Sequence, residues 1–353
     1  MKIPPVRRGA VVDGTPALSK RCHGRIRGRG AIRRRRFLWD GGPVGRISVG
    51  CVLNRLALTD ASGRRAIVLL ADSAGLDHLG FGDHVSFHTG AGSDGLLAAA
   101  GALAVSDRLA ANTGVYLLPL RHPMPVARQL ADIAALAPGR FVFGVGIGGE
   151  DPHEVQNCGV DPRTRGRRTD EALQIVRKLL TGDAVDVEGD HFTLEGARIA
   201  PAPQIPIPIV VGGRSDAAIR RAGRLGDGWF GIWVSPERYR QSLTSMQEAA
   251  GEVGRVPRLS VNALNVWCGV GDDRGEARGH VGKAMQQFYG IPYERFQRWS
   301  PAGTPAEVAD FLAPYVDAGC TLFNLIINGR SAEHEIEAAG TIRDRILQLT
   351  GGT

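Results

Sequence analysis

One stretch, residues 113–150, constrains the fold more than any other part of the chain, because it predicts a strand, a helix and a second strand in succession. Apolar runs at 115–118 and 141–145 are typical of buried strands. Between them, apolar residues recur at helical spacing from 126 to 136, and Pro138-Gly139 ends the helix. Such a unit predicts two parallel strands joined by a crossover helix.

The rest of the chain repeats this alternation. Eight predicted strands follow residue 46, at residues 47–53, 78–81, 113–118, 141–145, 207–211, 228–232, 259–268 and 322–327. Eight strands alternating with helices are typical of an α/β fold, the (β/α)8 TIM barrel, and a doubly wound open sheet is the alternative. Two insertions are predicted after strands four and seven. The first, 151–206, holds a helix at 167–180 and a hairpin turning at Gly189-Asp190, and the second, about 271–303, is expected to cover the barrel mouth.

Composition divides the chain into two parts. Residues 1–46 hold 13 Lys or Arg against two Asp, whereas the remainder holds 30 basic and 34 acidic residues. We therefore predict a disordered basic extension at 1–45 and one barrel domain at 46–353. An Arg-rich arm could bind nucleic acid, but no aromatic residue precedes Phe37 and no nucleic-acid-binding fold accompanies the arm, so nucleic acid is not an expected partner.

The sequence also predicts a cytoplasmic protein with reduced thiols. No apolar segment suits a secretory signal or a membrane span. The five cysteines are odd in number and form no C-x-x-C pair, and Cys51, Cys268 and Cys320 are expected in the core. Scattered histidines indicate no metal site, and no Gly-x-Ser-x-Gly or P-loop motif occurs.

Residues that follow the strands are the first candidates for a site, because ligands of parallel α/β folds bind at the carboxyl ends of strands. Gly212-Gly213-Arg214 follows the fifth strand and precedes a helix, which suits a phosphate, although a plain turn would also favour glycine. His84 follows the second strand and is the best candidate for proton delivery, with a structural role as the alternative.

The glycines after the fourth strand permit two interpretations. Gly144, Gly146 and Gly149 satisfy G-x-G-x-x-G, but no helix opens directly after them, so a dinucleotide fingerprint is disfavoured. They more simply end a barrel strand beside a ligand.

Five motifs in register resemble the bacterial-luciferase-like flavin and deazaflavin oxidoreductases. They are FGDH at 81–84, residues 113–123, GRFVFGVGIGG at 139–149, the hairpin at 188–203, and IPIVVGGRSDAAIRRAGRLGDGWF at 207–230. The resemblance covers most of 47–330. It implies a barrel that holds FMN or coenzyme F420 at the carboxyl ends of its strands, and either hydride transfer or oxygen activation at that ring.

The resemblance also implies roles for individual residues. A non-prolyl cis peptide is expected at Gly114-Val115, and a phosphate near Gly212. Catalytic roles are expected for His84 and Glu150. Cofactor contacts are expected from Asp83, Gly114, Val115, Gly148, Gly149, Gly212, Gly213 and Arg214. Supporting or wall positions are expected for Arg121, His122, Trp229 and Trp233.

Three functions follow as hypotheses. The leading one is F420-dependent hydride transfer to or from a small organic substrate. The alternatives are an FMN-dependent monooxygenase supplied by a flavin reductase, and a non-catalytic flavin-binding protein. The resemblance further implies a homodimer. A hollow bounded by His84, Gly114 and Gly212 is expected, with residues 85–96 and 271–303 as substrate walls.

Overall fold

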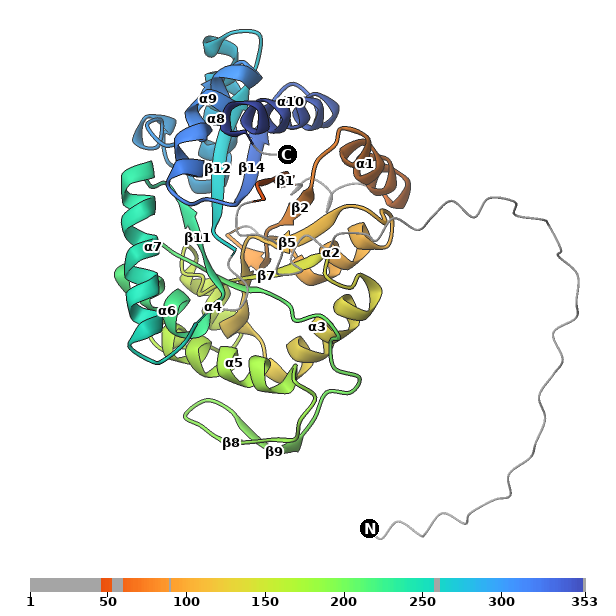
Figure 1. The fold of residues 1–353 in the computed structure, drawn as a ribbon, viewed down its shortest axis with the longest axis vertical. Coiled ribbons are helices and arrows are strands. Elements are labelled where there is room, and N and C mark those ends of the chain that lie inside the picture. The colour runs from red at the N-terminus through yellow and green to blue at the C-terminus, as the bar shows by residue number, and fades with distance from the viewer. Residues whose placement is uncertain (1–45, 53–59, 89, 257–260, 352–353) are drawn as a thin grey trace, which may run out of the picture. The chain divides into compact units, whose positions relative to one another are not determined.

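The computed structural model describes residues 46–52, 60–88, 90–256 and 261–351 (Figure 1). The predicted basic extension at 1–45 lies outside the described residues, as do Leu53 and Leu259 at the edges of two predicted strands. No helix in the described part of the chain is long and apolar enough to cross a membrane.

Eight parallel strands close into a barrel. In chain order they are β1 (Ser48–Val52), β2 (His78–Phe81), β5 (Ala110–Thr113), β7 (Phe141–Gly146), β10 (Ile209–Gly212), β11 (Gly228–Ile232), β12 (Ala263–Val270) and β14 (Leu322–Asn328). Each strand pairs with the next, and β14 pairs with β1 to complete the ring. The predicted TIM barrel is therefore confirmed, and the doubly wound sheet is excluded.

Helices surround the barrel on its outer side (Figure 1). The helices between strands and after the last strand are α1 (Ala61–Ser73), α2 (Gly95–Leu103), α3 (Pro123–Leu136), α5 (Arg165–Leu179), α6 (Asp216–Leu225), α7 (Pro236–Gly251), α9 (Pro305–Asp317) and α10 (Ala332–Thr350). The caps follow the sequence signals: Thr304 and Glu307 form the predicted capping box at the start of α9.

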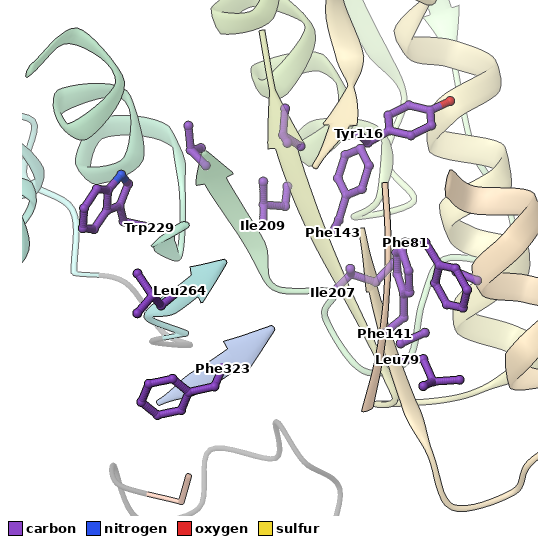
Figure 2. Packing of buried hydrophobic residues seen from close by; sticks show 14 of the residues in the cluster. Leu79, Phe81, Tyr116, Phe141, Phe143, Ile207, Ile209, Trp229, Leu264 and Phe323 are labelled. Carbon is purple, nitrogen blue, oxygen red and sulfur yellow. The ribbon is translucent and has the colours of Figure 1, made fainter. Parts of the chain in front are cut away.

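The strands are buried on both faces, because alternate side chains enter two separate cores. In β7, Phe141, Phe143 and Val145 pack in the layer between strands and helices, whereas Val142 packs inside the barrel with Phe230. Figure 2 shows that neighbouring strands contribute large side chains to the layer between the barrel and the helices. This double burial explains why the strands appear in the sequence as continuous apolar runs.

The prediction for strand three was wrong in its bounds. The predicted strand at 113–118 is two pieces: β5 ends at Thr113, a cis peptide joins Gly114 to Val115, and β6 (Tyr116–Leu117) then pairs with β7. A 3-10 turn, Leu118–Leu120, follows. The apolar run conceals this break, since both pieces are buried.

Both insertions contain helices that the sequence pattern did not indicate. After β7 come α4 (Pro152–Asn157), which was not predicted, α5, which confirms the helix predicted at 167–180, and the predicted hairpin of β8 (Val185–Glu188) and β9 (Thr193–Ala197). After β12 come α8 (Arg274–Tyr289), a 3-10 turn at Tyr293–Arg295 and β13 (Ala302–Gly303), which pairs with β12. A further hairpin, β3 (His84–Phe87) and β4 (Ala91–Ser93), follows β2.

Candidate active site

His84 is oriented by a buried carboxylate. Its Nδ1 atom lies 2.9 Å from Glu154 Oε2, while Glu154 Oε1 accepts the backbone N–H groups of Val85 at 2.6 Å and Ser86 at 3.0 Å. The Glu154 side chain is 3% exposed and that of His84 is 22% exposed. An ionised carboxylate only accepts hydrogen bonds, so Nδ1 carries a proton and Nε2 is left for another partner.

Glu154 was missed by the sequence analysis, which expected no helix directly after the glycines that end at Gly149. It lies in the first turn of α4, a helix that Asp151 caps by accepting the His153 N–H. The available signal was Asp-Pro-x-Glu, since Asp at the cap, proline at the first helical position and Glu in the first turn are typical of a helix start. Asp151 also accepts the N–H of His88, which ties the β3–β4 hairpin to α4.

Asp83 is occupied by protein donors. Its carboxylate accepts Arg121 Nη1 at 2.5 Å and Nη2 at 2.9 Å, the Leu117 N–H at 2.9 Å and the Gly95 N–H at 3.1 Å. Burial raises the pKa of Asp83, and the Arg121 charge opposes that rise. This geometry does not support the expected hydrogen bond to a cofactor, because both oxygens are taken. Asp83 instead positions β6 and the start of α2.

Val115 brings three strand ends together. The cis peptide Gly114-Val115 lies after β5, as the resemblance implies, and the Gly114 carbonyl accepts Asn265 Nδ2 at 3.2 Å. A Cβ on Gly212 would lie 2.8 Å from Val115 Cγ1, and a Cβ on Gly146 would crowd Val115 Cγ2. The glycines at the ends of β7 and β10 therefore leave room for the Val115 side chain.

The turn from β10 to α6 has the geometry of an anion site. Ser215 caps α6 by accepting the Ala218 N–H. Gly213 has φ +129°, a conformation that suits glycine, and a Cβ there would lie 2.7 Å from Ala218 Cβ. The Gly213 carbonyl accepts Trp229 Nε1 at 2.7 Å, so this buried tryptophan fixes the turn from below. Arg214 is exposed beside it.

The glycine pair after β7 leads to an exposed acid. Gly148 and Gly149 both have positive φ, and Glu150 is exposed. Burial raises the pKa of the Tyr289 hydroxyl, the Glu150 charge raises it further, and the Arg214 charge lowers it. Glu150 and Arg214 therefore both lie within electrostatic reach of the end of α8.

A line of aromatic rings joins His84 to the phosphate turn. Ring centroids are 6.1 Å apart for His84 and Phe288, 4.7 Å for Phe288 and Tyr289, and 5.2 Å for Tyr289 and Trp233. The Arg214 guanidinium then lies 5.2 Å from the Trp233 ring. The second insertion thus reaches from the end of β2 to the turn after β10, as expected of a segment over the barrel mouth.

Two expected residues have local structural contacts instead. His122 caps α3, since its Nδ1 accepts the Met124 N–H at 3.2 Å. Trp229 in β11 is fully buried. Trp233, which follows β11, is the tryptophan that contacts Arg214. The expected hollow between His84, Gly114 and Gly212 stays a prediction, because the two cavities described lie elsewhere, against α7, α8 and α9.

A phosphorylated flavin or deazaflavin fits these residues on two observations. The Gly213 turn leaves no room for a Cβ, which is typical of a backbone that a phosphate approaches closely. The rings of Phe288, Tyr289 and Trp233, which meet edge to face, provide an aromatic wall beside it.

Residues 54–302 match the family described as luciferase-like monooxygenase. The chain belongs to the luciferase-like monooxygenase family. This confirms the resemblance drawn from the five motifs.

Curated relatives of this luciferase-like protein include proteins named as dehydrogenases and one named as a monooxygenase. An F420-dependent glucose-6-phosphate dehydrogenase of Beutenbergia cavernae is 36% identical over 172 residues, which is 47% of this chain and 51% of the relative. The 4-hydroxyprotoasukamycin monooxygenase of Streptomyces nodosus subsp. asukaensis is 29% identical over 283 residues, 76% of this chain and 74% of the relative. The alignments span about half the length of the first curated relatives.

Solved structures agree on the fold. An F420-dependent secondary alcohol dehydrogenase in complex with an F420-acetone adduct superposes with a TM-score of 0.74 at 19% identity. The superposition covers 85% of this chain and 99% of that one. At this identity the likeness establishes the barrel architecture of the luciferase-like chain and nothing about its substrate.

Proposed function

We propose that this luciferase-like protein is an oxidoreductase that uses coenzyme F420 to move a hydride to or from a small organic substrate. The observation that carries the proposal is the line of rings from His84 to Arg214. It connects a candidate proton donor to a candidate phosphate turn through successive ring-to-ring contacts. Relatives named F420-dependent dehydrogenases support the choice of cofactor.

The residues would divide the work in a simple way. A bound deazaflavin supplies hydride chemistry, and the protein supplies position, protons and exclusion of water. Gly213 and Arg214 would hold the phosphate, and Val115 would support the ring. His84, with Nδ1 held by Glu154, would exchange a proton with the substrate at Nε2.

Glu150 is the second catalytic candidate. Glu150 is exposed, and its charge raises the pKa of Tyr289. In our proposal it contacts the substrate or the polar edge of the cofactor ring. Asp83 is reassigned to a positioning role, because its hydrogen bonds hold the segment that follows Val115.

An FMN-dependent monooxygenase is the second candidate, and the relative of Streptomyces nodosus favours it because that alignment covers most of both chains. Such an enzyme would need a flavin reductase as a partner. A flavin-binding protein without turnover is the third candidate. A homodimer and a cytoplasmic location belong to the proposal as well. Free thiols at all the described cysteines support the cytoplasmic location: Cys51, Cys158, Cys268 and Cys320.

Anaerobic titration of the purified protein with F420 and with FMN tests the cofactor. We expect the F420 spectrum to shift on binding and FMN to bind at least tenfold more weakly. Tighter binding of FMN, followed by oxygen consumption when it is reduced, would replace the proposal with the monooxygenase. Binding of F420 with no hydride exchange across a panel of alcohols, enones and imines would favour the non-catalytic protein.

A further inference from the structure

Part of the barrel interior is polar. The interior of such a barrel is ordinarily filled by branched apolar side chains, and Val142 and Phe230 follow that pattern here. Three strands instead contribute a buried asparagine each, from β5, β12 and β14: Asn112, Asn265 and Asn324. Apolar groups of similar shape could replace hydrogen-bonded amides at little cost in free energy, so stability alone does not account for the three asparagines.

The three amides form a chain of hydrogen bonds that ends on the backbone of Gly114. Asn112 Nδ2 donates to Asn324 Oδ1 at 3.5 Å, and because β5 and β14 are not neighbours in the ring, this contact crosses the barrel interior. Asn324 lies directly opposite Asn265 in the ladder of β14 and β12, and its Nδ2 donates to Asn265 Oδ1 at 2.7 Å. Asn265 Nδ2 donates to the Gly114 carbonyl at 3.2 Å.

The direction of this chain is fixed by its last member. A carbonyl oxygen only accepts, so Asn265 turns its NH2 group to Gly114 and its oxygen to Asn324. Asn324 then turns its own NH2 group to Asn265 and its oxygen to Asn112. The Asn112 oxygen is left over, and it is a buried atom without a hydrogen-bond partner in the described part of the chain. The three side chains therefore have one consistent arrangement, which the Gly114 carbonyl sets.

Glycines make room for the amides. A Cβ on Gly80 in β2 would overlap Asn324 Oδ1, and a Cβ on Gly114 would lie 2.6 Å from Asn324 Nδ2. The same Cβ on Gly114 would lie 3.3 Å from Asn112 Oδ1 and 3.4 Å from Asn265 Oδ1. Gly114 thus faces all three asparagines, and a larger residue there would displace them.

The Gly114-Val115 segment is held from two directions. The Gly114 carbonyl accepts Asn265 from the barrel interior. The Val115 side chain fits against the ends of β7 and β10, where Gly146 and Gly212 leave room for it. Loss of the contact with Asn265 would leave the segment fixed by Val115 alone.

We propose that Asn265, oriented by Asn324, is a positioning residue for the cofactor ring. By holding the Gly114 carbonyl, Asn265 fixes the backbone from which Val115 meets the ring, and Asn324 keeps the Asn265 amide in the orientation that donates. This inference rests on the proposed function, in which Val115 supports the ring of the cofactor. Neither asparagine exchanges a proton or a hydride.

Two matched variants test the inference by cofactor binding, with no substrate. Asn265→Asp keeps the shape of the side chain and the acceptor for Asn324, but as a carboxylate it cannot donate to Gly114. Asn262→Asp is the control, because Asn262 directly precedes the same strand and its Nδ2 donates to the Gly319 carbonyl at the same distance of 3.2 Å.

We expect Asn265→Asp to bind F420 about tenfold more weakly than the wild type, as for the loss of one buried hydrogen bond. The absorption band of the bound cofactor should also shift back towards that of free F420. Asn262→Asp should keep the wild-type affinity and spectrum, although both variants should lose a similar amount of thermal stability.

Asn324→Leu decides the question if Asn265→Asp does not fold. It leaves Asn265 in place without the NH2 group that orients it, so F420 affinity should fall about threefold. The double variant Asn265→Asp, Asn324→Leu should bind F420 no more weakly than Asn265→Asp, because both changes act through one hydrogen bond to Gly114.

Three results would overturn the inference: wild-type affinity and spectrum in Asn265→Asp, an equal loss of affinity in Asn262→Asp, or wild-type affinity in Asn324→Leu. If the wild type binds FMN rather than F420, the same variants are titrated with FMN, and the choice of F420 fails while the role of Asn265 is still tested. A wild type that binds neither cofactor overturns the proposed function itself.

Discussion

Replacing Glu154 by Gln should reverse the proton position on His84. Both backbone amides that Glu154 accepts point to Oε1, and the His84 Nδ1–H points to Oε2. A glutamine that keeps the two backbone bonds must place its NH2 group opposite Nδ1. Because an NH2 group only donates, Nδ1 must become the acceptor and the neutral ring must carry its proton on Nε2.

The size of the effect follows from these three hydrogen bonds. Hydrogen bonds to a charged acceptor contribute roughly 1.5–3 kcal/mol and neutral ones roughly 0.5–1.5 kcal/mol. Two backbone bonds that lose their charge should therefore lower the free energy of unfolding by about 2 kcal/mol. Loss of the correct tautomer should slow hydride transfer by about 10- to 100-fold, less than removal of the whole acid–base group in His84→Ala.

Nitrogen-15 spectra of histidine-labelled protein measure the tautomer directly, with no substrate or cofactor. In the wild type the His84 Nδ1 signal should be of the protonated type, and in Glu154→Gln it should move to the unprotonated type. Glu171→Gln is the control, because Glu171 accepts only backbone amides, those of His191 and Phe192, in the described structure. An unchanged His84 spectrum in Glu154→Gln, in a folded protein, would refute the reasoning.

Three further outcomes are expected. Gly213→Ala should lower both the melting temperature and the cofactor affinity, because φ at Gly213 is +129° and the new Cβ has no room. In the same two assays the control Gly251→Ala should be neutral or stabilising, because a Cβ at Gly251 meets no atom within 4 Å. Burial lowers the pKa of His78 to about 4, so the fold favours the neutral ring. This preference contributes about 3 kcal/mol to the free energy of unfolding above the unfolded pKa near 6.5, and the contribution is lost as pH falls towards 4. Urea unfolding between those pH values should therefore show a smaller change in stability with pH in His78→Asn than in the wild type. Asp83→Ala should cost roughly 3–5 kcal/mol in urea unfolding, because it removes a buried carboxylate that holds Arg121 and leaves that arginine only its 3.5 Å contact with Asp94; a loss below about 1 kcal/mol would contradict the role of Asp83.

The barrel could be predicted because its signals are local. Strands buried on both faces give apolar runs, and helix caps such as Thr304-Pro305-Ala306-Glu307 mark element starts. The break at Gly114 could not be seen in the same way. It depends on Asp83 and Arg121, which are 38 residues apart in sequence and hold the chain after Val115 through contacts that no local pattern encodes.

The site was predictable where backbone geometry fixes the residue type. Gly213 and the Ser215 cap follow from the needs of a strand-to-helix turn, and the turn has that geometry. The partner of His84 was not predictable, because the His84–Glu154 contact spans 70 residues and α4 is only six residues long. Nor could the sequence assign α8, whose aromatic residues cluster near its end without a clear apolar stripe.

A crystal structure of the protein with F420 tests the central claim most directly. The claim is that one flat ring lies across the carboxyl ends of the strands between His84 and Val115, with its phosphate on the backbone of Gly213 and Arg214. The account predicts density for the ring against Val115 and for the phosphate at the start of α6. A cofactor bound away from both residues, or a phosphate held by another turn, would contradict it.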